Sequence, residues 1–238
     1  MTTTDPRTTT LGDLVAANPA VARVLQAHGL DFCCHGERTL EAACAEAGVD
    51  VASVAARIAG TAVEGDTTWT RLAPEDLATH IVVTHHRYLW EELPLLEQLA
   101  DKVATVHGER HPELAEVRRL VAALRAELEP HLAKEEQVLF PAIAALAAGD
   151  APALPVPLSN PVRVMLREHD QAGELLAQLR ATTGGYAVPA DGCASYRSLY
   201  ERLEAVEADT HLHVLKENHA LFPAALALDE RAQGSAAS

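Results

Sequence analysis

The chain has 238 residues, of which 48% are hydrophobic and only 4% aromatic, and its formal net charge is −15. This length suits one or two domains with a buried core, and the charge excludes nucleic acid and anionic membranes as favoured partners. No apolar run reaches transmembrane length, and residues 1–10 contain no signal-peptide core, so we predict a cytoplasmic protein that contacts no membrane. Alanine and leucine dominate and β-branched runs are few, which favours an all-α fold.

The first sixty residues predict a frayed tail over 1–10 and a small helical domain over 11–60. Capping residues and terminal glycines mark its helices, which are expected over residues 20–28, 39–47 and 50–59. Three short helices are marginal as a free-standing domain. We therefore expect this domain to dock on another part of the chain or to form a homodimer.

Two adjacent cysteines, Cys33 and Cys34, lie in a turn of this domain beside His35 and Gly36. Adjacent cysteines seldom bind one metal together, and a disulfide between neighbours closes a strained ring. In a turn, however, a thiolate would be exposed and activated. We favour a redox or metal-handling role for this pair, and an inert loop is the alternative.

A polar linker over residues 61–73 leads to four long helices, which we expect at about 74–107, 112–148, 160–183 and 192–228. Short connections join the first helix to the second and the third to the fourth, so each pair forms an antiparallel hairpin. Residues 74–228 therefore predict a four-helix bundle. Pro130 should kink the second helix and help to aim His131, which follows it.

A repeated motif is the strongest chemical signal in the chain. The stretch His131-Leu-Ala-Lys-Glu135-Glu-Gln-Val-Leu-Phe-Pro-Ala returns 82 residues later as His213-Val-Leu-Lys-Glu217-Asn-His-Ala-Leu-Phe-Pro-Ala, with seven of twelve positions identical. Each copy places a histidine and a glutamate four residues apart, on one face of a helix. Imidazole nitrogen and carboxylate oxygen on one apolar helix face indicate metal ligands. An exposed ion pair is the alternative for one copy, and the second copy argues against it.

The first helix of each hairpin also carries a candidate ligand, and these two residues are His86 and His169. His85 adjoins His86, and only one of the two can point inward. Four imidazoles and two carboxylates from four helices suit a pair of transition-metal ions with bridging carboxylates. Iron is the best prediction, and ligand type alone also allows zinc or manganese. The predicted ligands are His86, His131, Glu135, His169, His213 and Glu217.

Three further acids lie close to these ligands in sequence. Glu127 and Asp209 precede His131 and His213 by four residues, so each lies one turn away on the same helix face. Such an acid can accept a hydrogen bond from the free nitrogen of a ligating histidine, or it can pass protons and cations inward. Glu168, next to His169, has a weaker claim to the same role. A solvated carboxylate is the alternative for each of these acids.

The motifs together resemble the iron-sulfur cluster repair di-iron proteins, the "repair of iron centres" family. The resemblance extends from about residue 11 to residue 228. It depends on Asp31-Phe-Cys-Cys-His-Gly36, on His86 with Glu91-Glu-Leu-Pro94, on Glu168-His169-Asp170-Gln-Ala-Gly-Glu174 and on the two motif copies. The histidine pair at residues 85–86 departs from the family pattern, which has a single histidine beside an aromatic residue.

The resemblance implies a hemerythrin-like bundle with an oxo-bridged pair of iron ions, in which Glu135 and Glu217 bridge. It also implies that the protein repairs iron–sulfur clusters damaged by nitrosative or oxidative stress, through iron donation or nitric oxide handling. Damaged iron–sulfur proteins would then be its partners, and O2 or NO its small ligands. A di-iron nitric oxide reductase or other oxidoreductase activity is left open.

Two alternative functions fit parts of this pattern. A hemerythrin-like oxygen or nitric oxide carrier or sensor would use the same ligands, but it has little need for Cys33 and Cys34. A ferritin-like oxidase expects Glu-x-x-His pairs and more carboxylates, whereas this chain has the order His-x-x-x-Glu. Cluster repair is therefore the leading prediction.

Overall fold

The computed structural model describes residues 5–150 and 154–236. These residues form helices joined by short turns and contain no β-strand, with one isolated bridge between Thr10 and Thr39. The all-α prediction is confirmed. None of the helices in these two ranges combines the length and apolar character needed to cross a bilayer.

The N-terminal domain has four short helices, one more than the sequence predicted. They are α1 (Leu11–Ala17), α2 (Val21–Ala27), α3 (Leu40–Ala47) and α4 (Val51–Ala59). Helix α1, which the sequence analysis does not predict, begins with a capping arrangement at Thr10. The Thr10 hydroxyl accepts a hydrogen bond from the Asp13 backbone N–H and donates one to the Asp13 carboxylate. The end of the predicted frayed tail is therefore an ordered helix cap.

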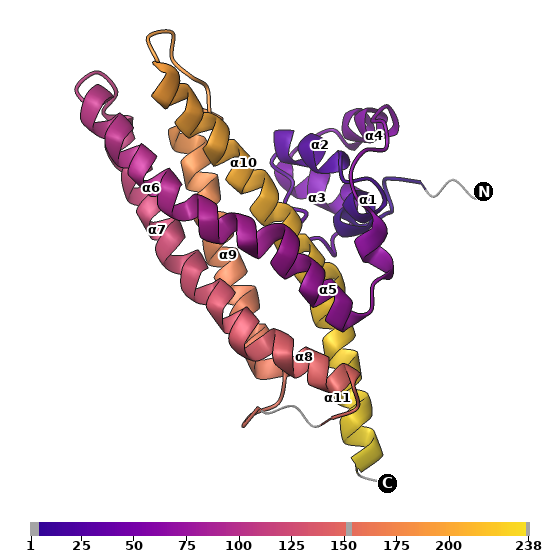
Figure 1. Ribbon diagram of the computed structural model, residues 1–238. Coiled ribbons are helices and arrows are strands. Elements are labelled where there is room, and N and C mark those ends of the chain that lie inside the picture. The colour runs from indigo at the N-terminus through magenta and orange to yellow at the C-terminus, as the bar shows by residue number, and fades with distance from the viewer. Residues whose placement is uncertain (1–4, 151–153, 237–238) are drawn as a thin grey trace.

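This domain docks on the C-terminal helix of the bundle. Val214 and Leu215 of α10 (Ala194–Lys216) belong to the apolar core of the small domain, and the indigo helices lie against α10 (Figure 1). At Gly12 the two parts approach closely, because a Cβ atom there would lie 2.5 Å from the His219 ring. The sequence predicted that this domain docks on another part of the chain or forms a homodimer, and the structure contains the docking within the chain.

One aromatic side chain of the linker packs against the bundle, although the linker is polar in composition. A 3-10 turn spans Thr68–Arg71, and its Trp69 side chain is buried in the apolar cluster at the lower end of the bundle. The linker is therefore packed against the bundle through one aromatic side chain.

The bundle consists of four long helical segments, three of which are interrupted. The first contains α5 (Pro74–Ile81), η2 (Val82–His86) and α6 (Arg87–His107). The second contains α7 (Glu113–Lys134), η3 (Glu135–Leu139) and α8 (Phe140–Ala147). The third is α9 (Ser159–Thr182), and the fourth contains α10, η4 (Glu217–Leu221) and α11 (Phe222–Ala236). Contacts join α6 to α7, α7 to α9, α9 to α10 and α10 back to α6, which closes the bundle.

The three interruptions are π-helical turns, and each contains a predicted metal ligand. In η3 and η4 the backbone N–H groups of Phe140 and Phe222 donate to the carbonyls of Glu135 and Glu217. Prolines follow both phenylalanines and supply no N–H, so the regular hydrogen-bond ladder cannot continue across these positions. Single π-turns within α-helices are frequent at functional sites.

Pro130 lies inside α7, which continues unbroken from Glu113 to Lys134. The π-turn that follows begins at Glu135, four residues after His131. Two apolar clusters flank this level of the bundle, one on the side of the hairpin loops and one around α5, α8 and α11.

Candidate metal centre

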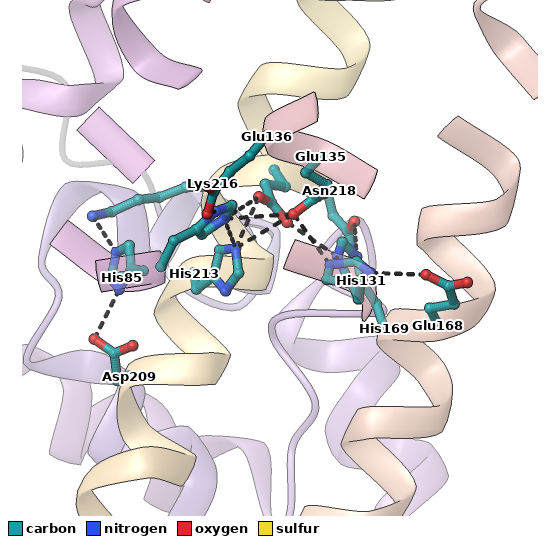
Figure 2. Close-up of polar contacts among 12 residues, drawn as sticks. His85, His131, Glu135, Glu136, Glu168, His169, Asp209, His213, Lys216 and Asn218 are labelled. Atoms are coloured by element: carbon teal, nitrogen blue, oxygen red, sulfur yellow. Dashed lines mark hydrogen bonds and ion pairs between the residues drawn. The ribbon is translucent and has the colours of Figure 1, made fainter. Parts of the chain in front are cut away.

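The structure brings the six predicted ligands together in the middle of the bundle. All six side chains are buried, and both glutamates have no exposed surface. Their donor atoms form two groups in which all atoms lie within 4.8 Å of one another. Figure 2 shows His213 on one side of Glu135, and His131 with His169 on the other.

The histidines pair across the two hairpins. The Nε2 atoms of His86 and His213 are 3.1 Å apart, and those of His131 and His169 are 3.2 Å apart. Each pair therefore takes one histidine from each hairpin, because antiparallel helices of different hairpins face each other at this level. Both glutamates belong to both groups.

The glutamates lie between the histidine pairs. For Glu135, Oε2 is 3.2 Å from His131 Nε2 and 3.5 Å from His86 Nε2. For Glu217, Oε2 is 3.0 Å from His169 Nε2 and Oε1 is 2.9 Å from His213 Nε2. Each carboxylate thus reaches one histidine of each pair, which is the arrangement that bridging ligands require.

The hydrogen bonding of the carboxylate oxygens indicates whether a cation fits this site. Both oxygens of Glu135 and Oε2 of Glu217 are buried and receive no hydrogen bond from any described residue. Burying a carboxylate without a hydrogen-bond donor or a counter-charge is strongly unfavourable. Imidazole and carboxylate are also the ligands that borderline transition metals prefer. The residues therefore fit a pair of cations.

The electrostatics of the cluster favour the ionised form of Glu217. Burial would raise the pKa of Glu217, but the neighbouring charge of His213 lowers it well below its usual value. Burial would likewise lower the pKa of His131, yet the charge of Glu135 raises it to about 10. Without a cation, the cluster would thus compensate its carboxylates with histidine protons, which a metal would displace.

Three of the four histidines are oriented by a polar side chain at Nδ1. His86 Nδ1 lies 3.0 Å from Glu136 Oε1, and the indole of Trp90 donates to the same oxygen. His131 Nδ1 lies 3.0 Å from Glu168 Oε2, and His169 Nδ1 lies 2.8 Å from Asn218 Oδ1. Such contacts leave Nε2 as the nitrogen that faces the centre.

The structure assigns the three predicted acids differently from the sequence. Glu168 contacts His131 rather than its neighbour His169, and Lys134 also binds it. Its pKa falls to about 2, chiefly because of the hydrogen bond with His131. For Glu127 the structure contains the alternative, a solvated carboxylate, because its side chain is exposed and Glu168 takes the position at His131 Nδ1.

The prediction for Asp209 was also wrong in its partner. Asp209 Oδ1 lies 2.8 Å from His85 Nδ1, while His213 Nδ1 has no hydrogen-bond partner among the described residues. His85 Nε2 contacts Lys216 Nζ at 2.7 Å, and the His85 ring stacks on His213 at 5.5 Å. Figure 2 shows Asp209, His85 and Lys216 in a row beside the centre. Both nitrogens of His85 are therefore occupied away from the cation groups.

This arrangement predicts different outcomes for the two neighbouring histidines. We expect His86→Ala to lower bound iron by about half or more, because it removes one ligand of a four-ligand group. We expect His85→Ala to retain the wild-type iron content. Metal analysis of both purified variants tests this, and loss of iron from His85→Ala with retention in His86→Ala would reverse the assignment.

Cys33 and Cys34 lie outside this cluster, where α9 and α10 meet the small domain. Both are free thiols, with Cys33 buried and Cys34 half-buried. The hydrogen bond with Cys34 and burial together raise the pKa of the Cys33 thiol well above its usual value. The expectation of an exposed, activated thiolate was therefore wrong for Cys33.

Two residues that orient the histidines were missed by the sequence analysis, namely Glu136 and Asn218. Both directly follow a bridging-glutamate candidate, so they occupy equivalent positions in the two motif copies. That equivalence could have revealed them. The histidines that they contact could not be predicted from the sequence, because each of these histidines lies on another helix than the residue that orients it.

Two family models and several relatives match this chain. A family model described as the hemerythrin HHE cation binding domain matches residues 77–225, and the ScdA_N model, described as a domain of unknown function (DUF542), matches residues 7–62. The iron-sulfur cluster repair protein YtfE of Enterobacter sp. (strain 638) is 34% identical over 218 residues, which is 91% of this chain and 96% of that protein. A probable iron-sulfur cluster repair protein of Haemophilus influenzae is 33% identical over 220 residues, with the same coverage.

Proposed function

Because this chain belongs to the family of iron-sulfur cluster repair proteins and carries a hemerythrin HHE cation binding domain, we propose that it holds two iron ions and uses them to restore damaged iron–sulfur clusters. The proposed ligands are His86 and His213 for one ion, His131 and His169 for the other, and the two glutamates as bridges. The observation that carries the proposal is the pair of fully buried carboxylates, three of whose four oxygens have no donor among the described residues.

The composition of the ligand set supports donation of iron over permanent storage. Two carboxylates contribute two negative charges, and the four imidazoles bind as neutral ligands, so two ferrous ions would leave a net positive site. Imidazole suits ferrous iron, while the harder ferric ion prefers oxygen ligands. Iron in this site would therefore be held less firmly than in a carboxylate-rich site.

The protein supplies orientation and exclusion of water, and bound iron would supply the redox chemistry and the affinity for O2 or NO. Each group in this site offers four protein donors, so an octahedral ion would keep positions for a small ligand. Glu136, Glu168 and Asn218 hold three of the histidines in place while iron enters or leaves. The two apolar clusters on either side limit the access of water.

A repair assay tests the proposal. A client enzyme whose [4Fe–4S] cluster has lost iron through exposure to nitric oxide or peroxide would be mixed anaerobically with the iron-loaded protein and a thiol reductant. We expect recovery of client activity in step with loss of iron from this protein. The Glu217→Leu variant, which removes one bridge, should give no recovery above that of free reductant.

The alternative function predicts another result in the same assay. A carrier or sensor would bind O2 or NO reversibly, with a visible spectral change, and would leave the client inactive while keeping its own iron. That outcome would overturn the repair proposal and favour a hemerythrin-like binding role.

A further inference from the structure

We propose that Asp31, Cys33 and Cys34 form a second cation site, separate from the bundle centre, that takes a thiophilic divalent ion such as Fe2+. This inference deepens the proposed function and rests on it for the identity of the ion. In cluster repair, such a site would hold iron beside the surface of the small domain before its transfer to a client. Binding of a divalent ion by these residues can be tested without reference to repair.

Two of the three distances between the donor atoms match those around one tetrahedral ion, and all three donors lie within 4.8 Å of one another. Two sulfurs that each lie about 2.3 Å from a tetrahedral ion are about 3.8 Å apart, and a sulfur and a carboxylate oxygen are about 3.5 Å apart. The Sγ atoms of Cys33 and Cys34 are 3.8 Å apart, and Cys33 Sγ lies 3.3 Å from Asp31 Oδ1. The turn thus overcomes the usual objection to adjacent cysteines, because it directs both sulfurs to one point.

Hydrogen bonds hold the Asp31 carboxylate in place before any ion binds. Asp31 Oδ1 accepts hydrogen bonds from the backbone N–H groups of Cys33 and Cys34, and Oδ2 lies 2.7 Å from His35 Nδ1. Gly36 closes the turn, since a Cβ atom there would lie 2.4 Å from the Phe32 carbonyl oxygen. Carboxylates that ligate metals are commonly held by such additional hydrogen bonds. On binding, the ion would replace the thiol protons, which pass to solvent.

Three ligands leave a fourth position, and the surroundings have room for it. The cluster lines a cavity of about 490 Å³ between the small domain and the bundle helices α9 and α10. On the bundle side, the cavity is lined by His211, whose Nδ1 is buried and has no partner among the described residues. A site with three protein ligands and an open position is typical of ions that exchange ligands, whereas closed four-ligand sites are structural.

Contacts connect this cluster to the bundle centre. The Asn218 amide donates to the Cys33 carbonyl at 3.1 Å, and its Oδ1 binds His169 Nδ1 at 2.8 Å. Cys34 Sγ also lies near α9, since a Cβ atom at Gly173, one turn after His169, would be 3.7 Å from it. The two cation sites therefore share one amide side chain and one helix.

Cobalt binding tests the proposal on the full-length protein. The chain would be loaded with iron, kept ferrous and anaerobic, reduced with a phosphine, and titrated with Co2+. Only thiolate ligands produce sulfur-to-cobalt charge-transfer absorption in the near ultraviolet, and the His and Glu ligands of the bundle produce none. We expect this band in the wild-type protein, its removal by excess Zn2+, and its absence from Cys33→Ser and from Cys34→Ser.

Two further variants complete the design. Asp31→Asn should weaken cobalt binding by about tenfold or more, while Cys193→Ser, which removes an exposed thiol elsewhere, should leave the band unchanged. Helix content and iron content of each variant establish that the fold and the bundle centre persist. Absence of the band from the wild type, or its survival in both Cys33→Ser and Cys34→Ser, would overturn the second site. Failure of the wild type to bind iron in the bundle would instead overturn the proposed function.

Discussion

Replacement of either bridging-glutamate candidate by leucine is expected to abolish binding of both iron ions. Glu135 and Glu217 each belong to both groups of donor atoms, so either substitution removes a ligand from both ions and one of only two negative charges in the site. We therefore expect Glu135→Leu and Glu217→Leu to lack bound iron and the visible absorption of an oxo-bridged pair. Iron analysis and optical spectra of the purified, air-exposed variants measure this.

Glu127→Leu is the matched control for this prediction. It makes the same change in the same helix as His131, but at an exposed position. We expect it to bind as much iron as the wild type. Full iron content in Glu135→Leu or Glu217→Leu would contradict the proposed centre. Iron loss in Glu127→Leu alone would show that Glu127 supports the centre, as the sequence predicts.

Removal of iron is expected to cause a large loss of thermal stability. A ligand that binds only the folded state, present at a thousand times its dissociation constant, stabilises that state by about 4 kcal/mol. In a domain of this size, each kcal/mol corresponds to about 2–4 °C in Tm, so chelation should lower Tm by about 8–16 °C. The physical reason is that histidine protons must then compensate the buried carboxylates in place of iron, and the binding free energy of iron to the folded state is lost. Thermal unfolding followed by circular dichroism, with and without chelator, measures the change.

Glu217→Leu again provides the control. Because this variant should hold no iron, its Tm should be the same with and without the chelator. An equal decrease of Tm in the variant would show that the chelator acts elsewhere on the protein. An unchanged Tm in the wild type, with its iron demonstrably removed, would show that the centre does not contribute to stability.

Much of the fold and the composition of the centre follow from local sequence patterns. A histidine and a glutamate four residues apart share a helix face whatever surrounds them, because the helix period is a local property. The duplicated motif therefore indicated His131, Glu135, His213 and Glu217 before any tertiary structure was considered. Alanine- and leucine-rich segments likewise predicted helices, and short connections predicted their antiparallel packing. The missed helix α1 and the buried Trp69 show where local signals were too short to recognise.

Contacts between helices were decided only by the tertiary structure. Whether Glu168 orients His131 or His169 depends on the rotation of α9 against α7, which sequence spacing does not specify. The same holds for Asp209, which contacts His85 instead of His213, and for the pairing of histidines across the two hairpins. The close approach of the Cys33 and Cys34 sulfurs also depends on a turn stabilised by Asp31. Spacing along one helix is thus set by the chain itself, while partners on different helices are set by packing, because side chains from distant segments must fill the same space.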